Sequence, residues 1–228
     1  MRTMPGKPEE LDRSSKLGEF FFRQMAKLRF LPSERRYNLT ISHEKKFVWF
    51  RVAKVGTRTI LHHFRTNGVR LDVEHPYFVH YSPRLYANYF KFAFTRNPWE
   101  RLVSCWVDKV ANAKERTVFN FSETELGRMK QFENFVEYVA TLDITNCNNH
   151  IRSQCALIDL NNVDYVGRME TFAADLTRIC HNLGIPSQTI VPINVTSRKP
   201  YREYYTDQLR DKVFEIYRTD VQVFGFEF

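Results

Sequence analysis

The sequence predicts a three-layer α/β fold in which helices flank a central, mostly parallel sheet. Short apolar runs typical of buried strands recur at residues 47–53, 92–95 and 163–167. Segments with apolar residues at helical spacing follow each run. Strands that alternate with helices in this way form parallel sheets, because each helix returns the chain to the edge where the next strand begins.

The helical segments are expected at 18–31, 57–66, 98–112, 132–142, 171–183 and 201–223. Asn97 suits the N-cap position of the third helix, because its side chain can accept hydrogen bonds from free backbone N–H groups. Pro98 then occupies the first helical position, where no N–H is needed. The polar segment 113–130 is expected to form a loop.

The composition indicates one folded domain with an extension before it. The chain has 228 residues, of which 43% are hydrophobic and 26% charged, and these values exclude collagen-like and wholly disordered proteins. Residues 1–46 are rich in charge and are expected to form a basic N-terminal extension with room for one amphipathic helix. Residues 47–228 are expected to form the domain.

The net charge is 34 − 26 = +8, which favours anionic partners such as phosphate groups, acidic glycans, nucleic acid or a membrane surface. No run approaches 18 apolar residues, so no membrane-spanning helix is expected. The polar N-terminus lacks the apolar stretch of a secretory signal, so a cytoplasmic protein with reduced cysteines is expected. A Cys147–Cys155 disulfide is the alternative. No Cys/His spacing fits a zinc site, and no metal is expected.

The segment between the first strand and the helix at 57–66 has the architecture of a phosphate-binding P-loop. Backbone N–H groups at a helix start bind anions, aided by the helix dipole. Gly56 allows the backbone to approach a ligand closely, and the hydroxyls of Thr57 and Thr59 add donors. Lys54 precedes the glycine, whereas the Walker A pattern of nucleotide kinases has its lysine after the last glycine. This order weakens a kinase assignment.

A second candidate anion site follows the strand at 92–95. Arg96 ends that strand, and its fork-shaped guanidinium suits bidentate phosphate binding. Ser104 lies about two turns into the next helix, from where it can reach the same anion. The sequence therefore predicts two phosphate-binding segments, each placed between a strand and a helix.

With both segments, the chain resembles the sulfotransferases that use 3′-phosphoadenosine-5′-phosphosulfate (PAPS). It is most similar to their carbohydrate branch, which includes chondroitin 4-O- and heparan sulfate 2-O-sulfotransferases. The shared motifs stand in the family's order at 54–59, 94–104, 150–154, 164–171 and 204–226. Ala53 occupies a position where the branch commonly has proline, and the membrane anchor of Golgi members is not found. The resemblance implies a sulfotransferase domain of P-loop type over 47–228.

The resemblance also implies a role for each candidate donor-binding residue. Lys54 would act on the bridging oxygen and stabilise the departing 3′-phosphoadenosine-5′-phosphate. The 5′-phosphate would be held by Gly56, Thr57, Arg58 and Thr59. The 3′-phosphate would be held by Arg96 and Ser104, with a late basic loop that contains Ser197, Arg198 and Lys199.

A catalytic base is expected between the two phosphate motifs, where carbohydrate sulfotransferases with a catalytic histidine carry it. His80 is favoured, and His75 is the alternative. His150, Gln154 and Glu170 are candidates for the acceptor side. The acceptor is expected to be a hydroxyl of a carbohydrate, and no nucleic-acid partner is expected. A P-loop nucleotide kinase and a non-catalytic polyanion-binding protein are the alternative functions.

Overall fold

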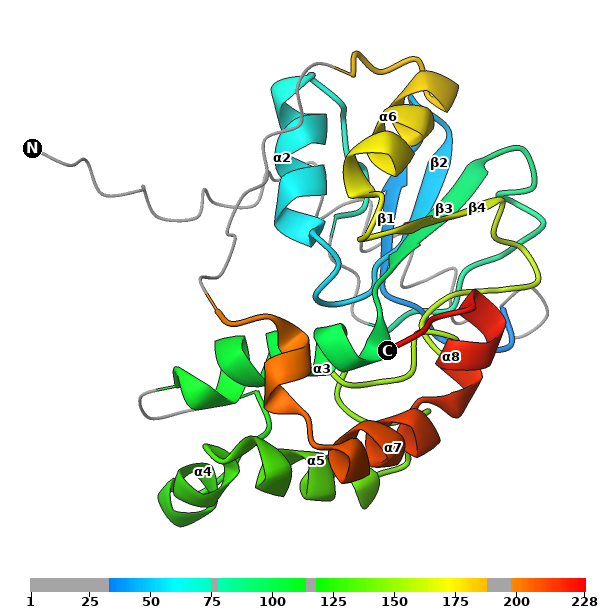
Figure 1. The fold of residues 1–228 in the computed structure, drawn as a ribbon. Helices are drawn as coiled ribbons and strands as arrows, with labels where there is room; N and C mark the ends of the chain where they lie inside the picture. Colours follow the sequence, from blue (N-terminus) through cyan, green and yellow to red (C-terminus); the bar gives the residue numbers. More distant parts are fainter. Residues whose placement is uncertain (1–32, 75–77, 114–117, 188–197) are drawn as a thin grey trace, which may run out of the picture.

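The structure, a computed structural model, describes residues 33–74, 78–113, 118–187 and 198–228. The helix expected at 18–31 lies outside these residues. A four-stranded sheet has the order β1-β2-β3-β4 (Figure 1). Its strands are β1 (Leu39–Ser42), β2 (Phe47–Phe50), β3 (Phe90–Thr95) and β4 (Tyr165–Arg168). β2, β3 and β4 are parallel neighbours, and β1 is antiparallel to β2. The predicted class, an α/β fold with a mostly parallel sheet flanked by helices, is confirmed.

β1 lies within the segment 1–46 that was expected to form an extension. Its four residues are all buried, and Leu39 and Ile41 pair with Phe50 and Val48 of β2. The run is only four residues long, and charged residues flank it on both sides. The sequence therefore shows no continuous apolar stretch that would predict a strand there. Part of the charged N-terminal segment therefore belongs to the sheet.

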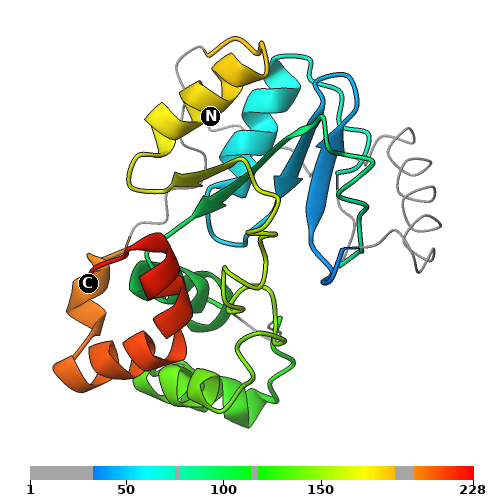
Figure 2. The same ribbon diagram turned by 90° about the vertical axis from the view of Figure 1, so that its right-hand side faces the viewer.

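One face of the sheet is covered by α2 (Thr57–Thr66) and α6 (Phe172–Asn182). Phe92 and Phe94 are separated by one residue in β3, so their side chains point to the same face of the sheet. The Phe92 ring lies 6.4 Å from that of Phe64 on α2, and the Phe94 ring lies 5.1 Å from that of Phe172 on α6. Figures 1 and 2 show the two helices side by side over this face. The predicted helices at 57–66 and 171–183 are confirmed.

The other helices pack together into a separate apolar core below the sheet (Figure 2). They are α3 (Pro98–Trp106), α4 (Glu123–Met129), α5 (Phe132–Ala140), α7 (Asp207–Ile216) and α8 (Arg218–Phe224), with the π-helical turn η1 (Val107–Ala111) and the 3-10 turn η2 (Tyr201–Tyr204). The prediction of a loop at 113–130 is wrong over the residues of α4. This helix begins with a capping box formed by Ser122 and Glu125. The single helix expected at 201–223 is divided into η2, α7 and α8. In the described ranges, no helix combines the length and apolar character needed to cross a bilayer.

α3 starts as predicted. Asn97 Oδ1 accepts hydrogen bonds from the N–H groups of Trp99 and Glu100, at 3.1 and 3.4 Å, and Pro98 is the first helical residue. The loops after β2 and β3 lie at the same edge of the sheet, because the two strands are parallel neighbours. The two predicted phosphate segments therefore meet there.

All four cysteines are free thiols, so the alternative Cys147–Cys155 disulfide is not formed.

Candidate functional site

The loop between β2 and α2 has a backbone that few side chains tolerate. Gly56 has a φ of +75°, and a Cβ added there would lie 2.8 Å from a ring carbon of Phe172. Lys54 also has a positive φ, of 73°, which is uncommon for a residue with a side chain. α2 begins at Thr57, so its first N–H groups, which lack helical partners, face this loop.

The three residues that open α2 differ in their surroundings. The Thr57 hydroxyl donates to the carbonyl of Val52 at 3.3 Å and so ties the helix start to the end of the strand. Thr59 is buried, whereas Arg58 is exposed. Of these three side chains, Arg58 presents its charge to solvent at the helix start.

Lys54 is paired with a carboxylate that the sequence prediction missed. Lys54 Nζ lies 2.9 Å from Asp108 Oδ2, and the same oxygen lies 3.1 Å from Lys109 Nζ. Burial lowers the pKa of Lys54, and the hydrogen bond and charge of Asp108 oppose that effect. The available signal was spacing, since Asp108 follows Ser104 by four residues, about one helical turn.

Arg96 and Arg198 share one carboxylate oxygen. Arg96 Nη2 donates to Glu100 Oε1 at 2.7 Å, and Arg198 Nη2 donates to the same oxygen at 3.0 Å. Burial alone would raise the pKa of Glu100, but the bonds and charges of the two arginines outweigh burial and lower it. Arg96 Nη1 also donates to the Lys54 carbonyl at 3.0 Å. This bond connects the two predicted phosphate segments directly.

Each of these arginines keeps a donor for a further partner. Arg96 Nε and Arg198 Nη1 are buried, and neither has a hydrogen-bond acceptor within the described ranges. Buried donors without acceptors are costly and rare. With two guanidinium groups and one carboxylate, the cluster carries a net positive charge. An anion with several oxygens would satisfy both nitrogens and balance that charge.

One side of α3, continued by η1, links this arginine cluster to Lys54 and is called the α3 face below. Glu100, Ser104 and Asp108 follow one another at intervals of four residues, which places them along one face of a helix. Ser104 is half-buried between the two charged positions. η1, the π-helical turn that carries Asp108, is a feature found often at functional sites. A ligand with an anionic group at each end would lie along this face.

Gln154 lies behind Arg96 and not on the acceptor side expected for it. It is fully buried, and its amide is bonded to the Arg96 backbone in both directions. Its own N–H donates to Asp220 Oδ2 at 2.7 Å. Gln154 therefore positions Arg96.

Glu170 borders a cavity that adjoins the arginine cluster. The cavity has a volume of about 350 Å³ and is lined by Asn97, Glu100, Arg168, Glu170, Tyr201, Arg202, Gly225, Phe226 and Glu227. It therefore lies next to Glu100, at the opposite end of the α3 face from Asp108. Lys199 is exposed near this end, and Ser197 lies outside the described residues.

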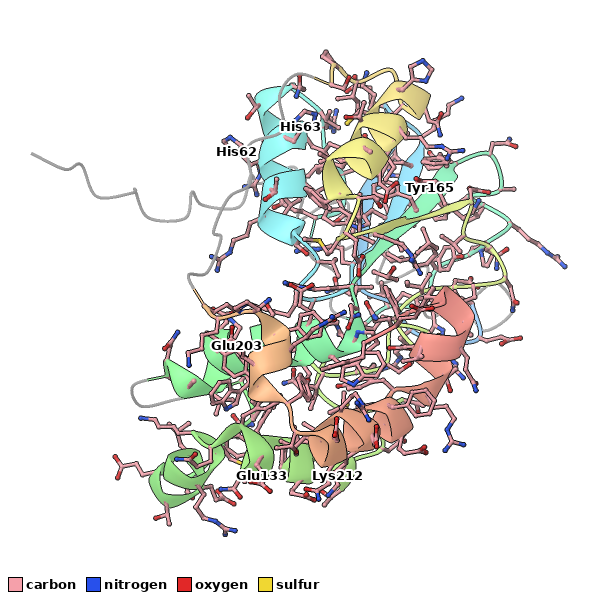
Figure 3. All side chains as sticks on the ribbon, viewed as in Figure 1. His62, His63, Glu133, Tyr165, Glu203 and Lys212 are labelled. Carbon is pink, nitrogen blue, oxygen red and sulfur yellow. The ribbon has the colours of Figure 1, made fainter. Side chains whose placement is uncertain are left out.

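The histidines are distributed over several parts of the fold. Figure 3 shows His62 and His63 on the half of α2 that lies farther from α3. His80 Nδ1 lies 2.7 Å from the Ser33 carbonyl oxygen. His75 lies outside the described residues.

His150 lies in a segment that Arg101 holds against the first loop. Arg101 is almost fully buried and makes three hydrogen bonds to backbone carbonyls. Its Nε donates to Ala53 O at 3.1 Å, its Nη1 to Arg152 O at 2.8 Å and its Nη2 to Asn149 O at 3.1 Å. The residues on both sides of His150 are thus tied to the residue that precedes Lys54.

In the comparison with protein families, the chain matches the sulfotransferase family over residues 37–227. No curated protein and no solved structure matches the chain. The matched range includes all four strands, both loops and the helices that carry Glu100, Asp108 and Asp220. It covers most of the 228 residues, and the chain belongs to the sulfotransferase family and is a sulfotransferase enzyme.

Proposed function

We propose that this sulfotransferase takes its sulfuryl group from PAPS and transfers it to a hydroxyl of a carbohydrate. The observation that carries the donor assignment is the pair of buried nitrogens, Arg96 Nε and Arg198 Nη1, which lack acceptors within the described ranges. A 3′-phosphate would give both an acceptor, and charge-assisted bonds of this kind are strong. An ordinary 5′-nucleotide lacks that phosphate and would leave them unpaired.

The chain's own groups act at the two ends of the α3 face. PAPS supplies the sulfuryl group when it is bound. Arg96, Ser104 and Arg198 hold its 3′-phosphate, with Ser197 and Lys199 as further candidates. The backbone N–H groups of Thr57, Arg58 and Thr59 at the start of α2 hold the 5′-phosphate, with the exposed Arg58 side chain and the close approach that Gly56 allows. Lys54 places its charge where the leaving oxygen becomes negative, and Asp108 favours the charged form of Lys54.

The remaining parts of the two ligands have suitable places. The cavity of about 350 Å³ beside Glu100 suits the nucleoside of the donor. A carbohydrate acceptor is supported by the motifs shared with the carbohydrate branch. Arg58 and Lys109 add positive charge near Lys54, which suits an acidic glycan.

Calorimetry with 3′-phosphoadenosine-5′-phosphate tests the donor assignment. We expect Arg96→Ala and Arg198→Ala each to weaken binding by about 10–100-fold, since a hydrogen bond to a charged group contributes about 1.5–3 kcal/mol. Arg128→Ala, at an exposed position of α4, is the matched control and should bind as the wild type does. Adenosine 5′-phosphate, without a 3′-phosphate, should bind weakly to all four proteins. Equal affinity of the wild type for both nucleotides would overturn the assignment.

Transfer of label from ³⁵S-PAPS tests the acceptor class. The panel comprises chondroitin, desulfated heparan sulfate, a simple alcohol and a tyrosine peptide, with ATP as an alternative donor. We expect label in a glycan and none after Lys54→Ala. Label in the peptide alone would overturn the carbohydrate assignment, and phosphate transfer from ATP would overturn the donor.

A further inference from the structure

We infer that His150 is the general base that takes the proton from the acceptor hydroxyl, an inference that rests on the proposed function. The sequence favours His80 for this task, and it placed His150 only on the acceptor side. The position of the His150 loop, the protonation state of its ring and the charges around it support the new assignment.

The loop that carries His150 is fixed beside the reacting end of the donor site. Arg101 donates to the carbonyls of Asn149 and Arg152, on either side of His150, and to the carbonyl of Ala53. Ala53 is followed directly by Lys54. A buried arginine with three such bonds leaves little freedom for the loop, so His150 keeps its place relative to Lys54.

The hydrogen bonds of Asn148 fix which ring nitrogen of His150 carries the proton. Asn148 Nδ2 donates to the carbonyl of Val118 at 2.8 Å, so Oδ1 is the end that faces His150. Oδ1 accepts from the His150 backbone N–H at 3.0 Å and lies 2.9 Å from Nδ1. Because an amide oxygen only accepts, Nδ1 must carry the hydrogen. Nε2 is then left with a lone pair and makes no hydrogen bond to any described residue.

The surroundings keep the ring neutral. Burial, followed by the positive charges of Lys109, Arg101 and Lys54, lowers the pKa of His150 to about 4, and Asp108 opposes this weakly. His150 is therefore unprotonated at neutral pH and free to accept a proton. Protonation becomes more favourable when the anionic donor offsets the same positive charges, which moves the ring toward the pKa that suits a base.

Two other groups fit the task less well. Asp108 is nearby, but its Oδ2 already accepts hydrogen bonds from Lys54 and Lys109. Burial would raise the pKa of Asp108, but the bonds and charges of the two lysines outweigh burial and lower it. The carboxylate therefore serves to hold Lys54.

His80 Nδ1 likewise faces an amide oxygen, the Ser33 carbonyl, so the tautomer does not separate the two histidines. What separates them is that the His150 segment is tied through Arg101 to Ala53 and that the charge of Lys54 acts on His150.

The step balances without any further reactant. The acceptor oxygen forms its bond to sulfur as the bond between sulfur and the bridging oxygen breaks. The hydroxyl proton moves to His150 Nε2, and the electron pair of the broken bond stays on the 5′-phosphate beside Lys54. His150 then releases its proton to solvent.

The test compares His150→Gln with His80→Gln as the matched variant. Transfer from PAPS gives kcat, and calorimetry with 3′-phosphoadenosine-5′-phosphate reports whether the donor site is intact. We expect His150→Gln to lower kcat by about 10²–10⁴-fold, the usual contribution of a general base, with donor affinity unchanged. His80→Gln should keep kcat close to the wild-type value.

A kcat for His150→Gln within a few-fold of the wild type, or the large loss in His80→Gln instead, overturns the inference. If His150→Gln also loses donor affinity, His150→Ala assayed with added imidazole decides, because rescue supports a base and absence of rescue contradicts it. Failure of the wild type itself to bind the nucleotide or transfer label would instead contradict the proposed function.

Discussion

Gln154 and Arg96 exchange two hydrogen bonds. The Arg96 N–H donates to Gln154 Oε1 and Gln154 Nε2 donates to the Arg96 carbonyl, each at 2.9 Å. Asp220 on α8 is fully buried and accepts from Ser153 Oγ at 2.6 Å and from the N–H groups of Gln154 and Cys155 at 2.7 and 2.9 Å. A carboxylate near the end of the chain thereby fixes the backbone from which the Arg96 guanidinium extends.

Gln154→Ala should reduce both stability and donor affinity. It leaves the N–H and carbonyl of Arg96 buried without partners, which costs about 1–3 kcal/mol for each group. Urea unfolding measures the stability, and calorimetry with 3′-phosphoadenosine-5′-phosphate measures the affinity. Gln131→Ala, at the exposed N-cap of α5 with no side-chain bond there, is the control and should change neither. Wild-type affinity in Gln154→Ala would show that the exchange does not place Arg96.

Gly56→Ala should be more harmful than Gly68→Ala. Both glycines have positive φ, of +75° and +69°, so both substitutions bring backbone strain of about 1–2 kcal/mol. A Cβ at Gly56 would also lie 2.8 Å from the Phe172 ring, while one at Gly68 would meet nothing within 4 Å. Thermal unfolding should therefore show the larger loss for Gly56→Ala, and only that variant should lose donor affinity. Equal losses of stability in the two variants would mean that backbone strain alone, without the contact to Phe172, accounts for the effect of Gly56→Ala.

Much of the fold was predictable because burial leaves a pattern in the sequence. The strands β2 and β4 and the helices α2, α5 and α6 were found from apolar runs and helical spacing. β3 starts two residues before its predicted position, because Lys91 interrupts the apolar run. Lys91 is nonetheless buried, and it donates to the Tyr89 carbonyl at 2.9 Å. α4 was missed because Leu126 is its one buried residue, so its capping box was the only local signal.

The candidate site was predictable where its residues stand close together in the chain. Lys54, Gly56, Arg96 and Ser104 belong to short motifs, which the sequence displays directly. The bonds of Glu100 with Arg198 and of Gln154 with Asp220 join residues 98 and 66 positions apart. Such pairs depend on how the chain folds, and no local pattern records them.

Asp108→Asn should make transfer more sensitive to alkaline pH. Asp108 opposes the effect of burial on Lys54, so its removal lowers the pKa of Lys54 further. A lysine with a lower pKa loses its charge at a lower pH as the pH rises, and the alkaline limb of kcat moves down. We expect kcat at high pH to fall by about 10-fold in Asp108→Asn. Lys54→Ala should lose more, about 10²–10³-fold, because it removes the donor that stabilises the developing charge.

The pH profile of kcat, measured beside that of Glu123→Gln on the exposed start of α4, checks this expectation. The control should follow the wild type. An unshifted alkaline limb in Asp108→Asn would mean that Asp108 does not support the charge of Lys54.

Asn148→Asp should move the acid limb of kcat/KM to higher pH. The carboxylate still accepts from His150 Nδ1, so the tautomer is kept, and its negative charge raises the pKa of His150. A base is lost as the pH falls through its pKa, which in the wild type is about 4 for the free protein, the state that kcat/KM reports. In the variant this loss begins at a higher pH.

Asn148→Leu separates this charge effect from orientation. It removes the acceptor and adds no charge, so we expect kcat to fall by roughly 10–100-fold, as when the orienting partner of a metal-bound imidazole is lost, without an upward shift of the acid limb. Profiles of kcat/KM from pH 4 upward distinguish the two variants. If Asn148→Asp followed the wild type across this range, the group that limits transfer in acid could not be the imidazole that Asn148 holds.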